Sequence, residues 1–373
     1  MCIRLILFIL LPTFVMAIAS CSENKNSQEA GNVVQALSGN NTTGFARADA
    51  PRNFVFPDDF GPHPQFQTEW WYYTGNLSGE DGREFGYQLT FFRRALDPDK
   101  IKRESMWATS QIYFAHFALT DVEGGEFYSS ERWSRGAAGL AGAQTKPFQV
   151  WIDNWSIEGD DKSFRLKAQD GSVSIDLLLN PLKAEVLQGN KGLSQKSKDL
   201  GNASYYFSQT RIESSGSISI EEQKFEVSGL SWLDREWSTS ALGEDQEGWD
   251  WFSIQLDDGR EIMLYQLRLK GGGIDPFSSG SLVGVQGDVT PLKAKGFKIE
   301  VLDTWKSPET GTVYPSKWQI SIPKHDIKLT VTPLLNNQEL LLSFIYWEGA
   351  VKVSGDGFSG KGYVELTGYK SQN

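Results

Sequence analysis

The sequence predicts an all-β protein that consists of two tandem antiparallel β-barrels. The main observation is a motif that occurs twice: an aromatic run, an Asp-Gly turn and a second apolar run that contains Tyr-Gln-Leu. The first copy covers residues 71–93, and the second covers residues 249–268 of the 373-residue chain. Because Asp-Gly between apolar runs is a strong hairpin signal, the motif indicates one fold that is used twice. A functional site is then expected inside a barrel or at the seam between the two.

Two further observations favour β-structure throughout the chain. Residues 107–119 are rich in aromatic side chains, as strands are, and shorter runs such as 173–179 and 328–332 partly alternate between apolar and polar residues. The 13 Trp, 12 Tyr and 22 Phe residues are a heavy aromatic load, which can fill barrel cores or line an apolar cavity. The sequence contains no long amphipathic helix, and the best candidate for a short helix covers residues 129–138.

The N-terminal segment predicts export and lipidation. Arg4 precedes an apolar run at residues 5–19, which is too short for a membrane span and suits a signal peptide. The run ends in Ile-Ala-Ser-Cys, which resembles the bacterial lipobox, where the signal is cleaved before a lipidated Cys. We therefore expect a lipoprotein signal peptide at residues 1–20 and a lipid anchor at Cys21. An ordinary signal peptide with an incidental Cys is the alternative.

The rest of the chain divides into a linker and two domains. Residues 21–53 are small and polar with few aromatic side chains, and they predict a flexible linker. The remaining residues are too many for one ordinary core. We expect an N-terminal barrel domain at residues 54–237 and a C-terminal barrel domain at residues 238–373.

Charge and the scarcity of metal-ligating residues argue against several functions. The net charge is −11 and no basic stripe is present, so nucleic-acid binding is not expected. The three histidines, His63, His116 and His325, show no metal-ligand spacing. Cys21 is the only cysteine after the signal peptide. We expect no metal, cofactor or disulfide, and we expect His116, which lies in an apolar run, to be a hydrogen-bonded core histidine.

The densest group of chemically reactive residues lies at residues 231–237. On a strand, alternate side chains point to opposite faces. One face then carries Trp232, Asp234 and Glu236, and the other carries Leu233, Arg235 and Trp237. Whichever face is buried, a charge is buried with it, and a buried charge must be paired or must shift its pKa.

Two interpretations of this segment stay open. In the structural one, Arg235 pairs with Glu69, Glu236 or Glu348 and holds strands in register. In the functional one, Asp234 or Glu236 is a carboxylic acid whose pKa is raised in an apolar cavity, so that it can protonate a substrate. Glu69 and Glu348 belong to the same question because each adjoins an aromatic run.

Seven motifs together resemble the AttH family, which comprises secreted or lipid-anchored bacterial proteins related to the carotenoid 1,2-hydratases (hydroxyneurosporene synthases). These motifs are TEWWYYTG at 68–75, YQLTFFR at 87–93, NASYY at 202–206, WLDREW at 232–237, GWDWF at 248–252, YWEGAV at 346–351 and GYVELTGY at 362–369. The resemblance covers nearly everything from residue 54 to residue 369. It implies two lipocalin-like barrels in tandem, in agreement with the repeat.

The resemblance also implies a chemistry. Carotenoid hydratases add water across a terminal isoprenoid double bond without a cofactor: an acid protonates the alkene and water traps the tertiary cation. Their key Asp follows an aromatic residue by two positions, and Trp232 with Asp234 fits that pattern. They also use a His and a Trp upstream, and the matching stretch at residues 202–207 contains neither.

We therefore predict a lipid-anchored envelope protein, on the periplasmic face of the outer membrane, that binds an apolar or isoprenoid-like small molecule. Exchange of this ligand with an ABC-type transporter permease is part of that prediction. The alternative is a cofactor-free hydro-lyase with Asp234 as general acid and Trp232, Tyr205 and Tyr206 as walls that stabilise a cation. A third hypothesis is a subunit of an envelope assembly that docks through the seam between the barrels.

The candidate catalytic residues are Asp234, Glu236 and Trp232. The candidate ligand-binding residues are aromatic or charged side chains of the quoted motifs and their neighbours: Glu69, Trp71, Tyr73, His116, Tyr205, Tyr206, Arg235, Trp249, Trp251, Trp347 and Glu348.

Overall fold

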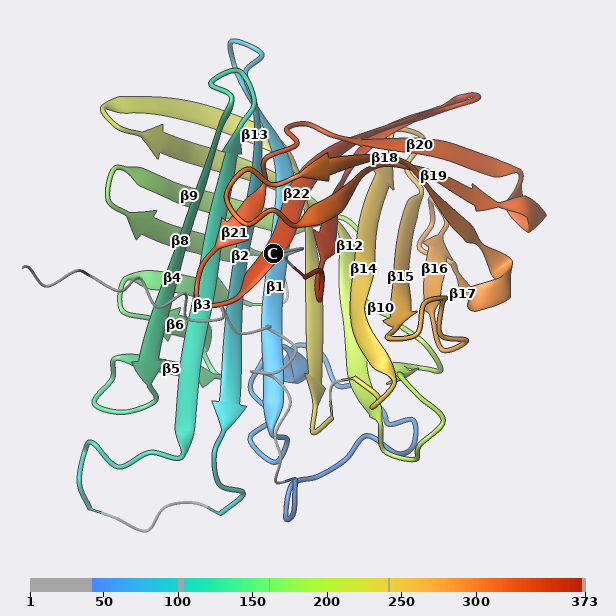
Figure 1. The fold of residues 1–373 in the computed structure, drawn as a ribbon. Coiled ribbons are helices and arrows are strands. Elements are labelled where there is room, and N and C mark those ends of the chain that lie inside the picture. Colours follow the sequence, from blue (N-terminus) through green and yellow to red (C-terminus); the bar gives the residue numbers. More distant parts are fainter. Residues whose placement is uncertain (1–41, 100–103, 161, 241, 371–373) are drawn as a thin grey trace, which may run out of the picture.

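The computed structural model describes residues 42–99, 104–160, 162–240 and 242–370. These residues form two antiparallel sheets, one a nearly closed barrel of 13 strands and the other a half-barrel of 10 strands (Figure 1). In the described ranges the helical elements are three short 3₁₀ turns, η1 (Asp58–Phe60), η2 (Ala294–Gly296) and η3 (Pro323–His325). The predicted all-β class with two lipocalin-like barrels is confirmed.

The first sheet has the strand order β4-β3-β2-β1-β13-β12-β9-β8-β7-β6-β5, and β10 and β11 pair with β12 outside this path. Its strands are β1 (Thr68–Gly79), β2 (Glu84–Ala95), β3 (Gln111–Asp121), β4 (Glu126–Arg135), β5 (Ala141–Gln144), β6 (Phe148–Ile152), β7 (Trp155–Gly159), β8 (Phe164–Asp170), β9 (Val173–Pro181), β10 (Val186–Leu187), β11 (Leu193–Gln195), β12 (Ala203–Ile220) and β13 (Gln223–Ser238).

The second sheet has the order β17-β16-β15-β14-β23-β22-β20-β19-β18, and β21 pairs with β22. Its strands are β14 (Gln246–Leu256), β15 (Glu261–Leu269), β16 (Ser279–Val283), β17 (Val289–Lys293), β18 (Lys298–Lys306), β19 (Val313–Ile322), β20 (Ile327–Pro333), β21 (Glu339–Leu341), β22 (Ile345–Gly355) and β23 (Phe358–Leu366). The chain leaves the first sheet at the end of β13 and enters the second at the start of β14.

The repeated motif forms the hairpins β1–β2 and β14–β15, one in each sheet. In the first turn, the Gly79 N–H donates to the carbonyl of Arg83 (2.8 Å), and the Gly82 N–H donates to the carbonyl of Gly79 (3.0 Å). Gly82 and its counterpart Gly259 have φ angles of 86° and 87°, whereas the preceding Asp residues have negative φ. Each loop is therefore a type I turn followed by a left-handed glycine, which explains why glycine is needed there.

The short helix predicted at residues 129–138 is wrong, because most of that segment is strand β4. Ser130 pairs with Phe117 and Trp133 pairs with Phe114 in the register of β3. The Trp133 and Phe114 rings also stack, with centroids 4.5 Å apart. Cross-strand pairing with an aromatic-rich neighbour thus outweighs the local propensity of a short polar segment.

The part of the predicted linker that the structure describes, residues 42–53, is docked on the first barrel. Ala48 is fully buried. The Thr239 hydroxyl donates to the carbonyl of Ala46, and the Tyr205 hydroxyl donates to the carbonyl of Ala50 (2.9 Å). Backbone hydrogen bonding therefore orders this segment despite its polar composition. The signal peptide, Cys21 and the rest of the linker lie outside the described residues.

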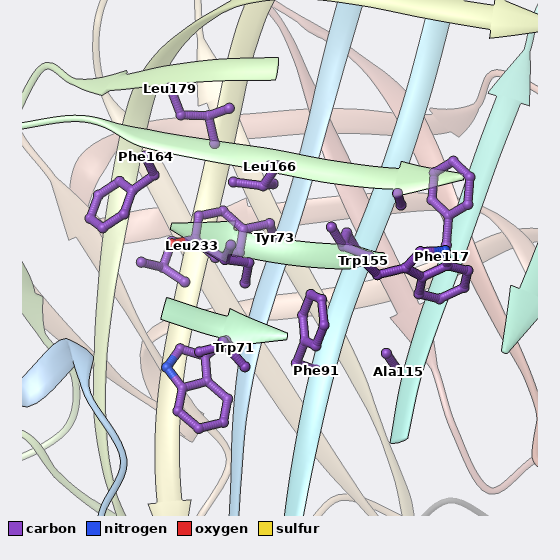
Figure 2. Packing of buried hydrophobic residues seen from close by; sticks show 14 of the residues in the cluster. Trp71, Tyr73, Phe91, Ala115, Phe117, Trp155, Phe164, Leu166, Leu179 and Leu233 are labelled. Atoms are coloured by element: carbon purple, nitrogen blue, oxygen red, sulfur yellow. The ribbon is translucent and has the colours of Figure 1, made fainter. Parts of the chain in front are cut away.

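Each sheet encloses its own core, and a third cluster of buried side chains lies between the two sheets. Figure 2 shows the first core, where side chains of β1, β2, β3 and β13 meet those of β7, β8 and β9. The opposite faces of β1 and β2 lie against β23 and β22 of the second sheet. The approach is close enough that a Cβ on Gly86 would overlap the Cβ of Ala350. We call this contact region the seam.

Polar contacts also join the two barrels across the seam. The Asn76 amide donates to the carbonyl of Gly362 (3.0 Å). Lys183 and Arg211 of the first barrel both bind the carboxylate of Glu261 of the second, and Glu261 is fully buried. Because buried polar groups are costly unless they are paired, these contacts fix how the two walls of the seam face each other.

Candidate functional site

A cavity of about 90 Å³ lies in the seam. The first barrel contributes Trp70, Tyr72, Phe92, Tyr206, Asp234 and Glu236 to its lining. The second barrel contributes Trp249, Trp251, Tyr265, Leu267, Tyr346, Glu348 and Glu365. Lys196, Ser240 and Leu242, which lie between strands, complete it. The site is therefore built from the outer faces of both sheets, and the barrel interiors are filled by their own cores.

Asp234 lies on this wall because side chains alternate along β13, as predicted, and the second barrel covers the face that carries Asp234. Its carboxylate accepts hydrogen bonds from the Tyr206 hydroxyl, from Ser208 Oγ (2.6 Å) and from Trp232 Nε1 (2.7 Å). Burial raises the pKa of Asp234 from 3.8 to about 7, although the three hydrogen bonds act to lower it. Trp251 Nε1 in turn donates to the Tyr206 hydroxyl (3.3 Å). Asp234 is therefore a carboxyl group fixed in position by hydrogen bonds that can gain or lose a proton near neutral pH.

Glu236 also faces the seam, where it pairs with Lys196. Their Nζ and Oε1 atoms are 3.2 Å apart. The ammonium lies 4.3 Å from the ring centroid of Tyr265 and 5.4 Å from that of Tyr206, so two aromatic faces also contact it. Burial acts to lower the pKa of Lys196, but Glu236, Tyr265 and Asp234 together outweigh it and the pKa is raised. The sequence did not single out Lys196, because it lies in a polar stretch with other lysines.

Two further carboxyls, Glu348 and Glu365, lie on the wall of the second barrel. They are directly opposite each other in the register of β22 and β23. The Tyr72 hydroxyl of the first barrel donates to Glu348 Oε2 (2.9 Å). Burial and the nearby Glu365 raise the pKa of Glu348 well above its usual value, and burial raises that of Glu365 to about 8. Glu365 was not among the predicted site residues, although it lies in the quoted motif at 362–369.

Five predicted ligand-binding residues lie inside the first barrel and do not line the cavity: Glu69, Trp71, Tyr73, Tyr205 and Arg235. Figure 2 shows Trp71 and Tyr73 in the core. Glu69 is fully buried and pairs with both Arg93 and Arg235. The Arg235 guanidinium also lies 4.0 Å from the Trp71 ring centroid. Of the three acidic partners proposed for Arg235, the structure thus selects Glu69.

The remaining predicted residues divide between the second core and the cavity edge. Trp347 belongs to the second core and does not line the cavity. His116 is fully buried, and its Nδ1 is 2.7 Å from the hydroxyl of Tyr346, a cavity residue. Burial lowers the pKa of His116 to about 4. It is a hydrogen-bonded core histidine, as predicted, and it supports one edge of the cavity wall.

The seam cavity brings together Asp234, Glu236, Tyr206, Trp249, Trp251 and Glu348 of the predicted site, and Trp232, which does not line it, donates a hydrogen bond to Asp234. Within the described residues, no group of three or more His, Cys, Asp or Glu side chains is arranged to hold a metal ion. In the same ranges, no helix has the length and apolar character needed to cross a membrane.

The fold and the site together define a two-barrel, all-β protein whose seam cavity combines aromatic walls and carboxyl groups. The sequence matches the family model described as AttH-like over residues 47–369. The chain therefore belongs to the AttH-like family, and the resemblance found in the sequence is confirmed.

Solved structures agree with this assignment. An AttH protein from Nitrosomonas europaea is 34% identical, and the alignment covers 87% of this chain and 100% of that one with a TM-score of 0.79. Kievitone hydratase from Nectria haematococca is 15% identical, with 88% and 97% of the two chains covered and a TM-score of 0.66. At that identity the likeness concerns the fold alone. The comparison with curated proteins found no match.

Proposed function

We propose that this protein is a cofactor-independent hydro-lyase that adds water to the double bond of an isoprenoid-like group bound in the seam cavity. The observation that carries the proposal is Asp234, a buried carboxyl with a pKa of about 7 in an aromatic-walled cavity. Family membership supports it, as does the fold shared with a protein that is described as a hydratase. The predicted alternative is thus favoured over binding without chemistry.

The reaction would begin with proton transfer from Asp234. The O–H bond of the acid breaks, a C–H bond forms at the less substituted alkene carbon, and the positive charge develops at the more substituted carbon. Water then forms a C–O bond to that carbon and releases a proton. Burial assists the first step because it keeps the carboxyl protonated near neutrality.

The aromatic walls would assist the second stage. Tyr72 and Trp251 lie edge-on to each other, with ring centroids 5.1 Å apart, and both line the cavity. Aromatic faces attract positive charge, most strongly where water is excluded. The walls would therefore stabilise the developing cation more than the neutral substrate, which is the requirement for catalysis.

The size of the cavity limits the group that reacts there. One water requires about 10–15 Å³ of such space, so a cavity of about 90 Å³ holds about six to nine groups of that size. This room suits a single dimethylallyl arm. We propose that the rest of a longer substrate stays outside the cavity.

The experiment offers the purified protein a set of compounds with dimethylallyl arms, together with acyclic terpenes, in water labelled with oxygen-18. Mass spectrometry should detect a product that carries one labelled water. Asp234→Asn should reduce the rate by about 10²–10⁴-fold, as expected for loss of a general acid. Absence of any hydrated product with the wild-type protein would contradict the proposal.

Asp250→Asn is the matched control. Asp250 is a buried carboxyl on β14 whose pKa burial also raises, but it pairs with Arg268 and does not line the cavity. If both variants lost activity equally, the effect of Asp234→Asn would reflect damage to the fold.

Several sequence predictions stay predictions. Lipidation of Cys21, location on the periplasmic face of the outer membrane and a transporter permease as partner all depend on residues or molecules outside those described. Binding of an apolar ligand without turnover would use the same cavity. It would be favoured if a bound compound were recovered unchanged from the protein.

A further inference from the structure

We propose that Glu348 and Glu365 form a proton-sharing carboxyl pair that positions and activates the water in this reaction, so that the acid and the water act from opposite walls of the cavity. This inference rests on the proposed function and assigns it a second group of catalytic residues.

The backbone places the two carboxyls together. Glu348 of β22 and Glu365 of β23 are direct cross-strand partners, and Cβ atoms of such partners are about 4.5–5.5 Å apart. Both side chains line the seam cavity. Two ionised carboxylates in that arrangement repel each other, so the pair favours a state that holds one proton between them.

Within the described part of the chain, no cation balances the pair. Among the described residues, neither Glu348 nor Glu365 takes part in an ion pair with Lys, Arg or His, whereas the neighbouring Glu236 has Lys196. The raised pKa values of both glutamates agree with a retained proton. The arrangement resembles other carboxyl pairs that share a proton because two like charges cannot both ionise at short range.

One oxygen of the pair lacks a hydrogen-bond partner among the described residues. Glu348 is fully buried, and its Oε2 accepts the Tyr72 hydroxyl. Its Oε1 has no hydrogen-bond partner within the part of the chain that the structure describes. Because buried polar atoms are normally hydrogen-bonded, an unpartnered carboxyl oxygen on a cavity wall suits contact with a polar ligand such as water.

The two walls then have different roles. Asp234 belongs to β13 of the first barrel, and the glutamate pair belongs to the second. A planar alkene between the walls presents one face to Asp234 and the other to the pair. Asp234 gives its proton to carbon and becomes a carboxylate. As the water forms its C–O bond, its released proton passes to the ionised oxygen of the pair. Before the next turnover the pair releases one proton to solvent, and solvent returns one proton to Asp234.

The test separates protonation from water addition. The probe is a phenol with a dimethylallyl arm in deuterium oxide, where reversible protonation alone leaves deuterium in the recovered alkene. For Glu348→Gln and Glu365→Gln we expect hydration to fall at least tenfold while deuterium still enters the alkene. Asp234→Asn should lose both processes. Thermal unfolding verifies that each variant folds. If Glu348→Gln does not fold, Glu365→Gln provides the test, because Glu365 is less buried.

The outcomes are distinct. If Glu348→Gln and Glu365→Gln hydrate the probe at the wild-type rate, the pair has no role and the inference is overturned while the proposed function stands. If the wild-type protein neither hydrates nor exchanges, the proposed function fails. Infrared spectroscopy at neutral pH then tests the shared proton without a substrate. A protonated-carboxyl band that persists in Asp234→Asn and disappears in Glu365→Gln supports the pair, and its absence from the wild type refutes it.

Discussion

Replacement of Glu261 by Gln should strongly destabilise the contact between the two barrels. Glu261 is fully buried at the start of β15 and binds Lys183 Nζ at 2.8 Å as well as the Arg211 guanidinium. The side chains of Lys183 and Arg211 are only 9% and 14% exposed. The amide preserves the shape of the side chain but removes the only negative charge among Glu261, Lys183 and Arg211. Two nearly buried cations then remain without an anionic partner.

The magnitude follows from this geometry. Removal of one partner from a buried ion pair typically costs about 3–5 kcal/mol, because the remaining charge is left uncompensated. With a urea dependence of about 2–3 kcal/mol per molar, the unfolding midpoint should fall by about 1–2.5 M. Asp176→Asn is the matched control, since Asp176 and Arg165 are 42% and 51% exposed and such pairs contribute about 0–1 kcal/mol.

Urea titrations followed by tryptophan fluorescence and far-ultraviolet circular dichroism measure both variants. The fluorescence is informative because Trp232 and Trp251 lie in the cluster between the barrels. Separation of the barrels would then change fluorescence before circular dichroism. A loss below about 1 kcal/mol for Glu261→Gln, equal to that of the control, would refute the argument that this buried trio fixes the seam.

Three other predictions concern the cavity and its walls. First, turnover should fall as the pH rises through about 7, because only protonated Asp234 can act as the acid, and a pH–rate profile measures this. Folding stability should follow the same group. Since the pKa of Asp234 is raised from 3.8 to about 7, its protonated form stabilises the fold at low pH, and this contribution should be lost as the pH rises between those values. Second, Lys196→Met should leave Glu236 unpaired beside Asp234, so the descending limb of the pH–rate profile should move to higher pH; an unchanged limb would contradict the role given to Lys196. Third, Gly86→Ala should destabilise the protein by about 1–3 kcal/mol through overlap with Ala350, and Ala350→Gly in the same chain should restore the melting temperature.

The sequence predicted the alternation in β13 correctly but could not identify what each face contacts. Asp234 and Glu236 face one way and Arg235 the other, as the period of a strand requires. Both faces are buried, one by the first core and one by the second barrel. Which surface covers each face of β13 depends on how two complete sheets dock, and a local sequence pattern carries no information about that docking.

The glutamate pair illustrates a second limit. Glu348 adjoins an aromatic run and was predicted as a site residue for that reason. Glu365 lies in a motif that was used only to recognise the family. Their pairing follows from the register of β22 against β23. Lys196 was missed for a different reason: it lies in a polar stretch between β11 and β12, and only the tertiary structure places it over Tyr265. In the same way, the docking of residues 42–53 depends on carbonyl groups, which composition does not reveal.

The two copies of the repeat contribute different side chains to the two walls of the cavity. Tyr-Gln-Leu begins five positions after Gly82 in the first copy but six positions after Gly259 in the second. In a strand, a shift of one residue moves a side chain to the opposite face. Tyr87 therefore belongs to the first barrel's core, where its hydroxyl contacts Ser231 Oγ (2.6 Å). Tyr265 instead faces the seam, where the Lys196 ammonium lies over its ring.

The same shift affects the aromatic runs. When the copies are aligned at their turns, Tyr72 and Trp249 are equivalent, and both line the cavity. When they are aligned by their leading tryptophans, Trp71 is matched with Trp249, although Trp71 is in the first core. The same residue type thus lies on opposite faces in the two copies, and structurally equivalent positions are those at the same distance from the turn. Two copies of one hairpin can in this way present different side chains to the cavity, Tyr72 from the first copy and Trp249 and Tyr265 from the second.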